Sequence, residues 1–264
     1  MANPPNKALH RTAARPGASR CARFVEPRMS VEARGRAAVG ELVRHAIDAK
    51  APGAQTPMNS TLLADAAISA LLQVTLLAGV PFLGYFMYQK WRHKRSFSEV
   101  AKRAGLQGCP WRHLAWSAAF ALIGVIIILI WSPPLELFTR QWSVQRQFVG
   151  LGFSMTAITL AVLNGVVQTA FAEELLFRGL IAGSLSRRLP VVWANVLQAL
   201  IFLLPHLLIL LAMPEMWGLL PLIFVGALLF GWMRIKSGSI IGPWLMHASG
   251  NVTMALSIAI RTTG

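Results

Sequence analysis

The sequence has few charged residues and few acidic ones in particular. Asp, Glu, Lys and Arg make up 13% of the 264 residues, and only ten residues are acidic, whereas about 25% of an average soluble domain is charged. This composition argues against an ordinary soluble enzyme.

Cysteine is also scarce. Cys21 and Cys109 lie outside the apolar runs without metal-ligand spacing, so neither a disulfide framework nor a cysteine-based zinc site is expected, and a reduced, intracellular setting suits Cys109.

Basic residues are numerous but unevenly distributed. The formal net charge is +15, yet residues 1–57 hold ten of the 25 Lys and Arg residues and the segment 90–112 holds another seven. An excess of this size can indicate a nucleic-acid partner. Since the rest of the chain is mainly apolar, we expect no nucleic-acid partner for the folded part of the protein.

Long apolar runs dominate the rest of the sequence. A helix needs about 20 apolar residues to cross a bilayer, and apolar runs occur at 62–88, 114–131, 148–185, 191–212, 219–233 and 240–260. They predict an all-α, polytopic integral membrane helical bundle with about six transmembrane helices. The stretch 148–188 is about twice as long as a bilayer core is thick. It predicts either a break near Asn164 and Gly165 or one long tilted helix that emerges into the cytoplasm.

The distribution of Lys and Arg between loops predicts the orientation. By the positive-inside rule, the basic linker at 90–112 is cytoplasmic, and alternation then places Arg187, Arg188, Arg234 and Lys236 on the same side. The residues before the first span are therefore expected outside. This position conflicts with the positive-inside rule, because the tail carries ten basic residues. The tail is expected to be a lipid-contacting arm, a nucleic-acid-binding tail, or a segment that is not translated because synthesis starts at Met58.

Three parts of the chain are expected. Residues 1–57 form the basic tail rich in Ala, Arg and Pro, which is disordered if it is translated at all. Residues 58–147 hold two transmembrane helices and the basic cytoplasmic linker, and residues 148–264 hold a polar-residue-bearing core. We expect a multi-pass protein of the bacterial plasma membrane. Membrane lipid is an expected partner.

The core carries ionisable and polar side chains inside its apolar runs. Charged side chains at bilayer depth cost on the order of 2.5–3.5 kcal/mol on insertion scales, so they usually face the bundle interior and mark function. Glu174 and Arg178 are spaced i,i+4 in the order that favours an ion pair. Glu173 lies ~100° away around the helix and stays available for chemistry. The full set of candidate residues, from three separate runs, is Glu173, Glu174, Arg178, Phe202, His206, His247 and Asn251.

These residues form the patterns Glu-Glu-x-x-x-Arg, Phe-x-x-x-His and His-x-x-x-Asn, in that order. The chain resembles the CPBP family of intramembrane proteases, which includes type II CAAX prenyl endopeptidases and bacteriocin-processing or self-immunity proteins. The resemblance covers about residues 148–260. It implies that Glu173 and His206 activate water and that His247 and Asn251 form an oxyanion hole. Glu174, Arg178 and Phe202 then have supporting roles, and the substrate is a membrane-associated peptide or protein, prenylated or of leader type.

Other functions compete with this interpretation. Two His and one Glu also resemble a His₂Glu zinc site, but the local His-Glu-x-x-His motif is absent, so no cofactor is expected and zinc is the alternative. No Gly-x-Ser-x-Gly turn supports a serine enzyme, and no pair of intramembrane aspartates supports an aspartyl enzyme. Intramembrane Glu, His and Arg also occur in proton-coupled transporters. A catalytically idle scaffold or immunity protein on the same fold is the third possibility.

Overall fold

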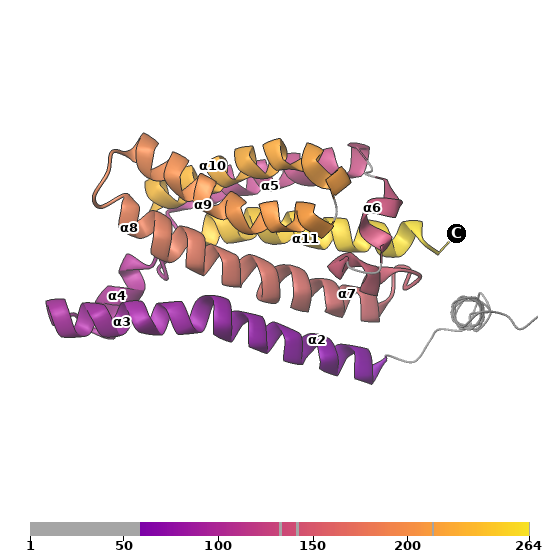
Figure 1. Cartoon of the computed structure of the whole chain (residues 1–264), viewed down its shortest axis with the longest axis horizontal. Coiled ribbons are helices and arrows are strands. Elements are labelled where there is room, and N and C mark those ends of the chain that lie inside the picture. Colours follow the sequence, from indigo (N-terminus) through magenta and orange to yellow (C-terminus); the bar gives the residue numbers. More distant parts are fainter. Residues whose placement is uncertain (1–58, 132–133, 141–142, 213, 264) are drawn as a thin grey trace, which may run out of the picture. The chain divides into compact units, whose positions relative to one another are not determined.

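The computed structural model describes residues 59–131, 134–140, 143–212 and 214–263, which belong to one compact unit spanning residues 56–264. Helices connected by short turns and loops make up this described part, and it contains no strand (Figure 1). The predicted all-α fold is confirmed. The basic tail and Met58 lie outside the described residues, so the three expectations for the tail stay predictions.

The first long helix runs along one edge of the bundle. It comprises α2 (Ser60–Gln73), a π-helical segment η1 (Val74–Gly79) and α3 (Val80–His93), which together form a continuous helix of 34 residues. Asn59 caps its start, because the side-chain oxygen of Asn59 accepts a hydrogen bond from the Leu62 backbone N–H. The helix ends where Lys94 adopts a left-handed conformation with φ 55°. It is longer at both ends than the apolar run 62–88.

The basic linker folds into a short helix, α4 (Phe97–Arg103). A capping box begins this helix: Ser96 and Glu99 exchange hydrogen bonds between side chain and backbone. The backbone N–H of Ser96 stabilises the carboxylate and lowers the pKa of Glu99 from its ordinary value. The second long helix, α5 (Trp111–Trp131), follows, and α6 (Leu135–Thr139) and the 3-10 segment η2 (Val144–Phe148) connect it to the core.

The stretch around Asn164 and Gly165 is helical without a break. It consists of α7 (Met155–Ala161), η3 (Val162–Phe171), η4 (Glu174–Ala182) and α8 (Gly183–Leu185), which form one helix of 31 residues. The single long helix is thus the correct alternative. It starts at Met155 rather than Phe148, because Ser154 caps it and Gly150 and Gly152 have positive φ.

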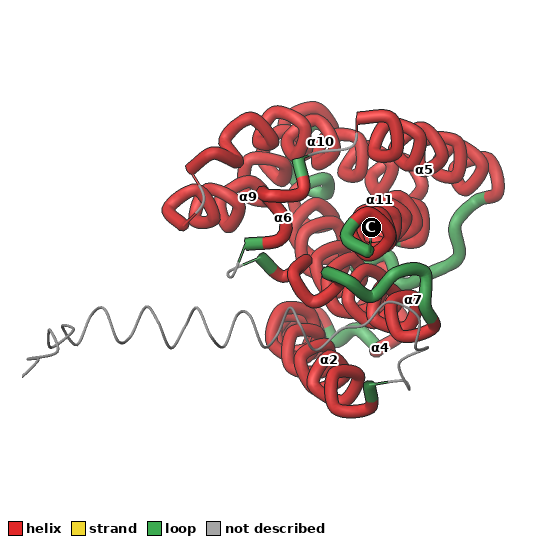
Figure 2. The backbone as a smooth tube through the Cα atoms, turned by 90° about the vertical axis from the view of Figure 1, so that its right-hand side faces the viewer, coloured by secondary structure: helices red, strands yellow, loops and turns green. Residues whose placement is uncertain are grey.

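Three more helices complete the described bundle. They are α9 (Val191–Ala212), α10 (Leu220–Ser237), which follows the 3-10 segment η5 (Pro214–Leu219), and α11 (Ile241–Arg261). Helix α11 contacts α5, α10, α7 and η3, and Figure 2 shows it end-on among the other helices. Five helices in the described part are long and apolar enough to cross a membrane, and α11 is not among them. The protein is therefore an integral, multi-pass membrane protein.

The polarity of α11 follows from its central place. The residues that reduce its hydropathy include His247, Ser249, Asn251 and Thr253, and each is partly buried within the bundle. A peripheral helix such as α5 shows the opposite pattern: Ser117 and Ala121 are buried, whereas Ile126 and Ile130 are 45% and 80% exposed. Small residues at helix contacts and large apolar residues outside are typical of bundles in lipid. Helix α11 can hold polar groups because other helices surround it.

Candidate active site

The two adjacent glutamates lie at the junction of two π-helical segments. Glu173 follows the segment η3, and Glu174 is the first residue of η4. Segments with π-helical hydrogen bonds are rare and frequently occur at functional sites. Successive residues on a helix point in different directions, so the two carboxylates have different surroundings.

Glu174 is completely buried and holds two partners. Its Oε1 atom accepts a hydrogen bond from Arg178 Nη1 at 3.0 Å, in an ion pair whose side chains are both 0% exposed. The same oxygen lies 2.9 Å from His247 Nδ1. The ion pair was expected from the i,i+4 spacing, but the contact with His247 was not, because the two residues are 73 positions apart. Glu174 therefore orients the His247 ring as well as neutralising Arg178.

Arg178 lies between two aromatic rings. Its guanidinium carbon is 4.1 Å from the ring centroid of Phe202 and 5.3 Å from that of Phe230. Cation–π contacts of this kind stabilise a desolvated guanidinium by about 2 kcal/mol. The Nε and Nη2 atoms of Arg178 are buried and have no hydrogen-bond partner among the described residues. Glu174 and the two rings thus hold this buried charge in place. Nothing in the sequence pattern had singled out Phe230.

Glu173 is the accessible carboxylate of the pair. Its side chain is 18% exposed, and its Oε2 atom lies 3.9 Å from His247 Nε2. This separation is too long for a direct hydrogen bond. A water molecule that bridged the two atoms would lie at about 2.8 Å from each of them, a common bridging geometry. The carboxylate and the imidazole together form a place where one water can be held.

His206 lies on α9 next to Pro205, which interrupts the backbone hydrogen bonds of that helix. The Nδ1 atom of His206 is 2.9 Å from the Phe202 carbonyl oxygen. A carbonyl only accepts, so Nδ1 carries the proton, and the Nε2 atom of a neutral ring is free to accept. The Phe202 ring is centred 4.7 Å from the His206 ring and 6.5 Å from the His247 ring. Phe202 is thus a common neighbour of both histidines.

Asn251 has a different neighbour. Its Nδ2 atom donates a 3.4 Å hydrogen bond to the carbonyl of Gly165 on η3. Gly165 allows this close approach, since a Cβ atom there would lie 3.1 Å from the Asn251 Cβ. Gly165 precedes Glu173 by eight residues, about 12 Å along a helix. The structure therefore gathers Glu173, Glu174, Arg178, Phe202 and His247, with His206 beyond Phe202, while the Asn251 amide bonds elsewhere.

The donor set does not form a metal centre in this arrangement. Within the described ranges, no group of three or more His, Cys, Asp or Glu side chains is placed so that it could hold a metal ion. Glu173 and His247 face each other, but no hydrogen bond or ion pair links His206 to either of them among these residues.

Comparison with known proteins gives a match to the segment that carries these residues. The family model of Rce1-like type II CAAX prenyl endopeptidases matches residues 154–253. This segment is a CPBP-family domain. The match includes all seven residues singled out from the sequence and begins at Ser154, the residue that caps the long central helix. Neither the curated proteins nor the solved structures gave a further match.

The CPBP domain is built on the helices that meet around the glutamates. Glu173, Glu174 and Arg178 come from the 31-residue helix, Phe202 and His206 from α9, Phe230 from α10, and His247 from α11. The match of this segment supports a CAAX-type intramembrane protease at the level of the family. Helices α2, α3 and α5 lie outside the matched residues and pack against the CPBP domain through η3, η4 and α11.

Proposed function

We propose that the protein is an intramembrane endopeptidase in which Glu173 activates the hydrolytic water. One observation carries this proposal: the two adjacent glutamates have opposite surroundings. Glu174 is fully buried and paired with Arg178 and His247, whereas Glu173 is partly exposed and has no partner closer than 3.9 Å among the described residues. A carboxylate with free lone pairs inside a membrane bundle can accept a proton from water and later pass it to the leaving amine.

The imidazoles supply the second contact with water or substrate. His206, with its proton on Nδ1, offers Nε2 as an acceptor, which suits the role of orienting water with Glu173. His247 offers Nε2 on the side of Glu173. In its protonated form this atom donates and can stabilise an oxyanion, and Asn251 is the proposed second donor. Such donors contribute about 3 kcal/mol each in a site shielded from bulk water.

Asn251 fills that role only if its amide turns from the Gly165 carbonyl toward the substrate. The present hydrogen bond is long, at 3.4 Å, so exchanging it for a bond to a developing negative charge is favourable. We propose that substrate binding causes this exchange and that hydrolysis proceeds without a metal ion. The proposed substrate is a membrane-associated peptide, prenylated or of leader type, and the proposed location is the bacterial plasma membrane.

The decisive experiment compares peptide termini in cells that produce the wild-type protein or the Glu173→Gln variant. Gln keeps the size of Glu but lacks its basicity, so membrane-associated peptides cleaved by the wild type should stay intact in the variant. The purified variant should retain wild-type unfolding behaviour and lose at least about 10²-fold in turnover. Glu136→Gln is a matched control, because Glu136 is an exposed carboxylate of α6 outside the CPBP domain.

Two results would count against the assignment. The first is wild-type cleavage by Glu173→Gln, since Glu173 could then not be the base that accepts the proton from water. The second is a loss of cleavage in Glu136→Gln as large as that in Glu173→Gln. The loss would then come from the removal of a negative charge anywhere in the protein. His206→Ala should resemble Glu173→Gln in turnover, and wild-type turnover there would remove His206 from the mechanism.

A further inference from the structure

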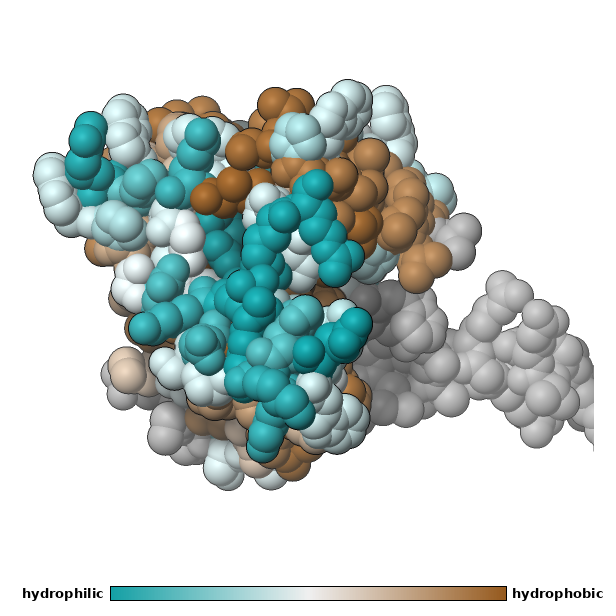
Figure 3. All heavy atoms as spheres, turned by 90° about the vertical axis from the view of Figure 1, so that its left-hand side faces the viewer, coloured by the Kyte–Doolittle hydropathy of each residue, from teal (hydrophilic) through white to brown (hydrophobic). Residues whose placement is uncertain are grey.

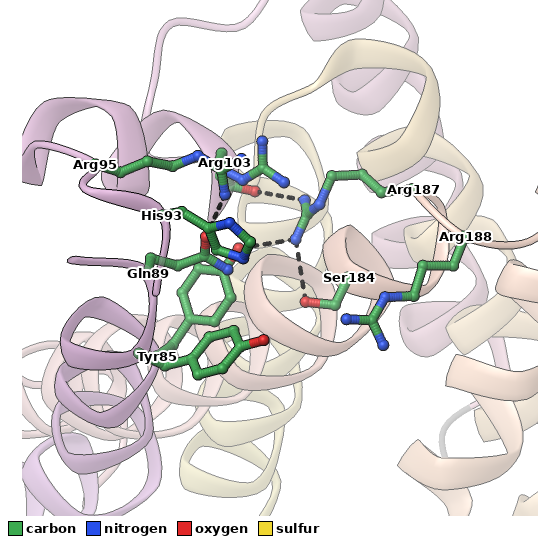
Figure 4. Close-up of a pocket in the computed structure, with 9 residues that line it drawn as sticks. Tyr85, Gln89, His93, Arg95, Arg103, Ser184, Arg187 and Arg188 are labelled. Carbon is green, nitrogen blue, oxygen red and sulfur yellow. Dashed lines mark hydrogen bonds between the residues drawn. The ribbon is translucent and has the colours of Figure 1, made fainter. Parts of the chain in front are cut away.

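A second polar site lies at the end of the bundle where α3, α4 and α8 meet. It is a cavity of about 410 Å³, within the range of pockets that hold small ligands. Figure 4 shows Gln89, His93 and Arg95 on one side and Arg187 and Arg188 reaching in from the other. The complete lining consists of Tyr85, Tyr88, Gln89, His93, Arg95, Arg103, Ser184, Arg187 and Arg188.

The cavity is strongly positive. Four of the nine described lining residues are arginines, and none is an aspartate or glutamate. Among the described residues no carboxylate forms an ion pair with any of these arginines. Burial lowers the pKa of Arg187; Tyr85 acts in the opposite direction, and the charges of Arg103, Arg95 and Arg188 lower the pKa as well. Glu99, the nearby carboxylate that interacts with Arg95, is outside the lining. Like charges repel one another, so an anion bound in this cavity would reduce the repulsion among the four arginines.

Two of the four arginines, Arg187 and Arg95, are held in position by hydrogen bonds. The guanidinium of Arg187 donates to the Tyr85 hydroxyl at 2.9 Å, to Ser184 Oγ at 3.1 Å and to the Arg103 carbonyl at 3.4 Å. Arg95 is likewise hydrogen-bonded to the Gln89 side chain. Guanidinium groups fixed in this way match the oxygen atoms of a phosphate group better than flexible ammonium groups do.

The position of the cavity indicates the source of the anion. Its walls lie at the ends of two candidate membrane spans, Ser60–His93 and Met155–Leu185. Beside it Tyr88 and Trp91 are 51% and 69% exposed, and such aromatic side chains are typical of the headgroup level of a bilayer. Figure 3 shows hydrophilic residues gathered over this end of the molecule next to hydrophobic ones. Lipid phosphates lie at this level.

We propose that this cavity binds the phosphate of an anionic phospholipid headgroup, held by Arg187, Arg188, Arg103 and Arg95. The Arg188 side chain is exposed and makes no hydrogen bond to the described residues, so it can turn toward the bound phosphate. Arg103 contributes a buried Nε atom that has no partner among them. Basic pockets at the cytoplasmic ends of membrane helices bind lipid headgroups in this way. The site is separate from the glutamates and does not depend on peptide cleavage.

The test measures ligand affinity of the full chain in detergent by thermal stabilisation. Short-chain phosphatidylglycerol, short-chain phosphatidylcholine and inorganic phosphate are titrated separately. We expect phosphatidylglycerol to stabilise the protein at concentrations at which the other two do not. The variant Arg187→Gln/Arg188→Gln should weaken phosphatidylglycerol binding by about tenfold or more. Arg188→Gln alone removes no observed hydrogen bond and should weaken phosphatidylglycerol binding by about threefold or more. This single variant tests the proposal if the double variant folds poorly.

The matched control is Arg92→Gln/Lys102→Gln, which removes the same charge from exposed positions of α3 and α4 outside the cavity. Its affinity should stay within about threefold of wild type. An equal loss in this control would overturn the proposal in favour of a general surface charge. Equal binding of phosphatidylcholine, or stabilisation by inorganic phosphate alone, would also overturn it. None of these results bears on the proposed peptidase.

Discussion

Variants of the buried ion pair between Glu174 and Arg178 should change the stability of the protein and its peptide cleavage in different ways. The variants Glu174→Leu and Arg178→Met remove one charge each, and the double variant removes both. Leaving one partner of a fully buried pair unpaired typically costs about 3–5 kcal/mol. Arg178 has no other acceptor in the described structure, and its contacts with Phe202 and Phe230 are already present in the wild type. They therefore do not offset the loss in Glu174→Leu.

The double variant should recover most of this loss in stability. With both charges gone, the remaining defect is the His247 Nδ1–H group, which loses its acceptor at a cost of about 1–3 kcal/mol. Replacing a buried ion pair by apolar side chains of similar volume is often neutral or stabilising. The double variant should thus unfold at higher denaturant concentration than Glu174→Leu. Peptide cleavage should stay low, because His247 has lost the hydrogen bond to Glu174 that fixes its Nδ1 atom.

Equilibrium unfolding in mixed micelles gives the free energies, and cleavage by the same preparations gives the activities. Glu136→Leu is the control, since a change at an exposed carboxylate should stay within about 0.5 kcal/mol. A double variant less stable than the sum of the two single losses would refute a simple clamp. Restored cleavage in the double variant would refute the idea that Glu174 positions His247.

Three further outcomes are expected. His247→Ala and Asn251→Ala should lower kcat more than they raise KM, as expected for groups that bind the transition state, and the reverse split would indicate substrate-binding roles. Protein treated with a strong chelator should keep its activity, and loss that zinc restores stoichiometrically would replace the metal-free mechanism. Gly179→Ala should destabilise the protein by about 1–3 kcal/mol in unfolding assays, because its Cβ would lie 2.7 Å from the Ala104 carbonyl oxygen. Gly124→Ala, with nothing within 4 Å, is the control and should be neutral or stabilising.

The fold was predictable from the sequence to the extent that hydropathy determines it. Each of the six apolar runs contains a helix, because lipid forces every apolar segment to satisfy its backbone hydrogen bonds internally. The ends were less predictable. Asn59 and Ser154 set helix starts through side-chain hydrogen bonds that hydropathy does not register. The π-helical segment η3, which contains Asn164 and Gly165, and the segment η4 have no signal in the apolar pattern.

Local contacts of the site were also predictable, and distant ones were not. The i,i+4 spacing of Glu174 and Arg178 corresponds to an ion pair in the structure, because helix geometry alone brings these positions together. The approach of His247 to the same carboxylate depends on the packing of α11 against the long helix, which no spacing encodes. The same holds for Phe230 against Arg178. The cationic cavity joins three segments whose charges predict only the orientation in the membrane.

The difference between the two glutamates shows why the site needs both. A single buried carboxylate that neutralised Arg178 and fixed His247 would be tied to both partners through one oxygen atom, as Glu174 is, with its side chain 0% exposed. Since the next residue on a helix points about 100° away, Glu173 lies beside the same His247 ring, is partly exposed, and takes no part in that pairing. Glu174 thus keeps Arg178 and His247 in place, and Glu173 stays free beside them. Exchanging either role for the other would require a rotation of the helix, so the order of the two residues is fixed by the geometry.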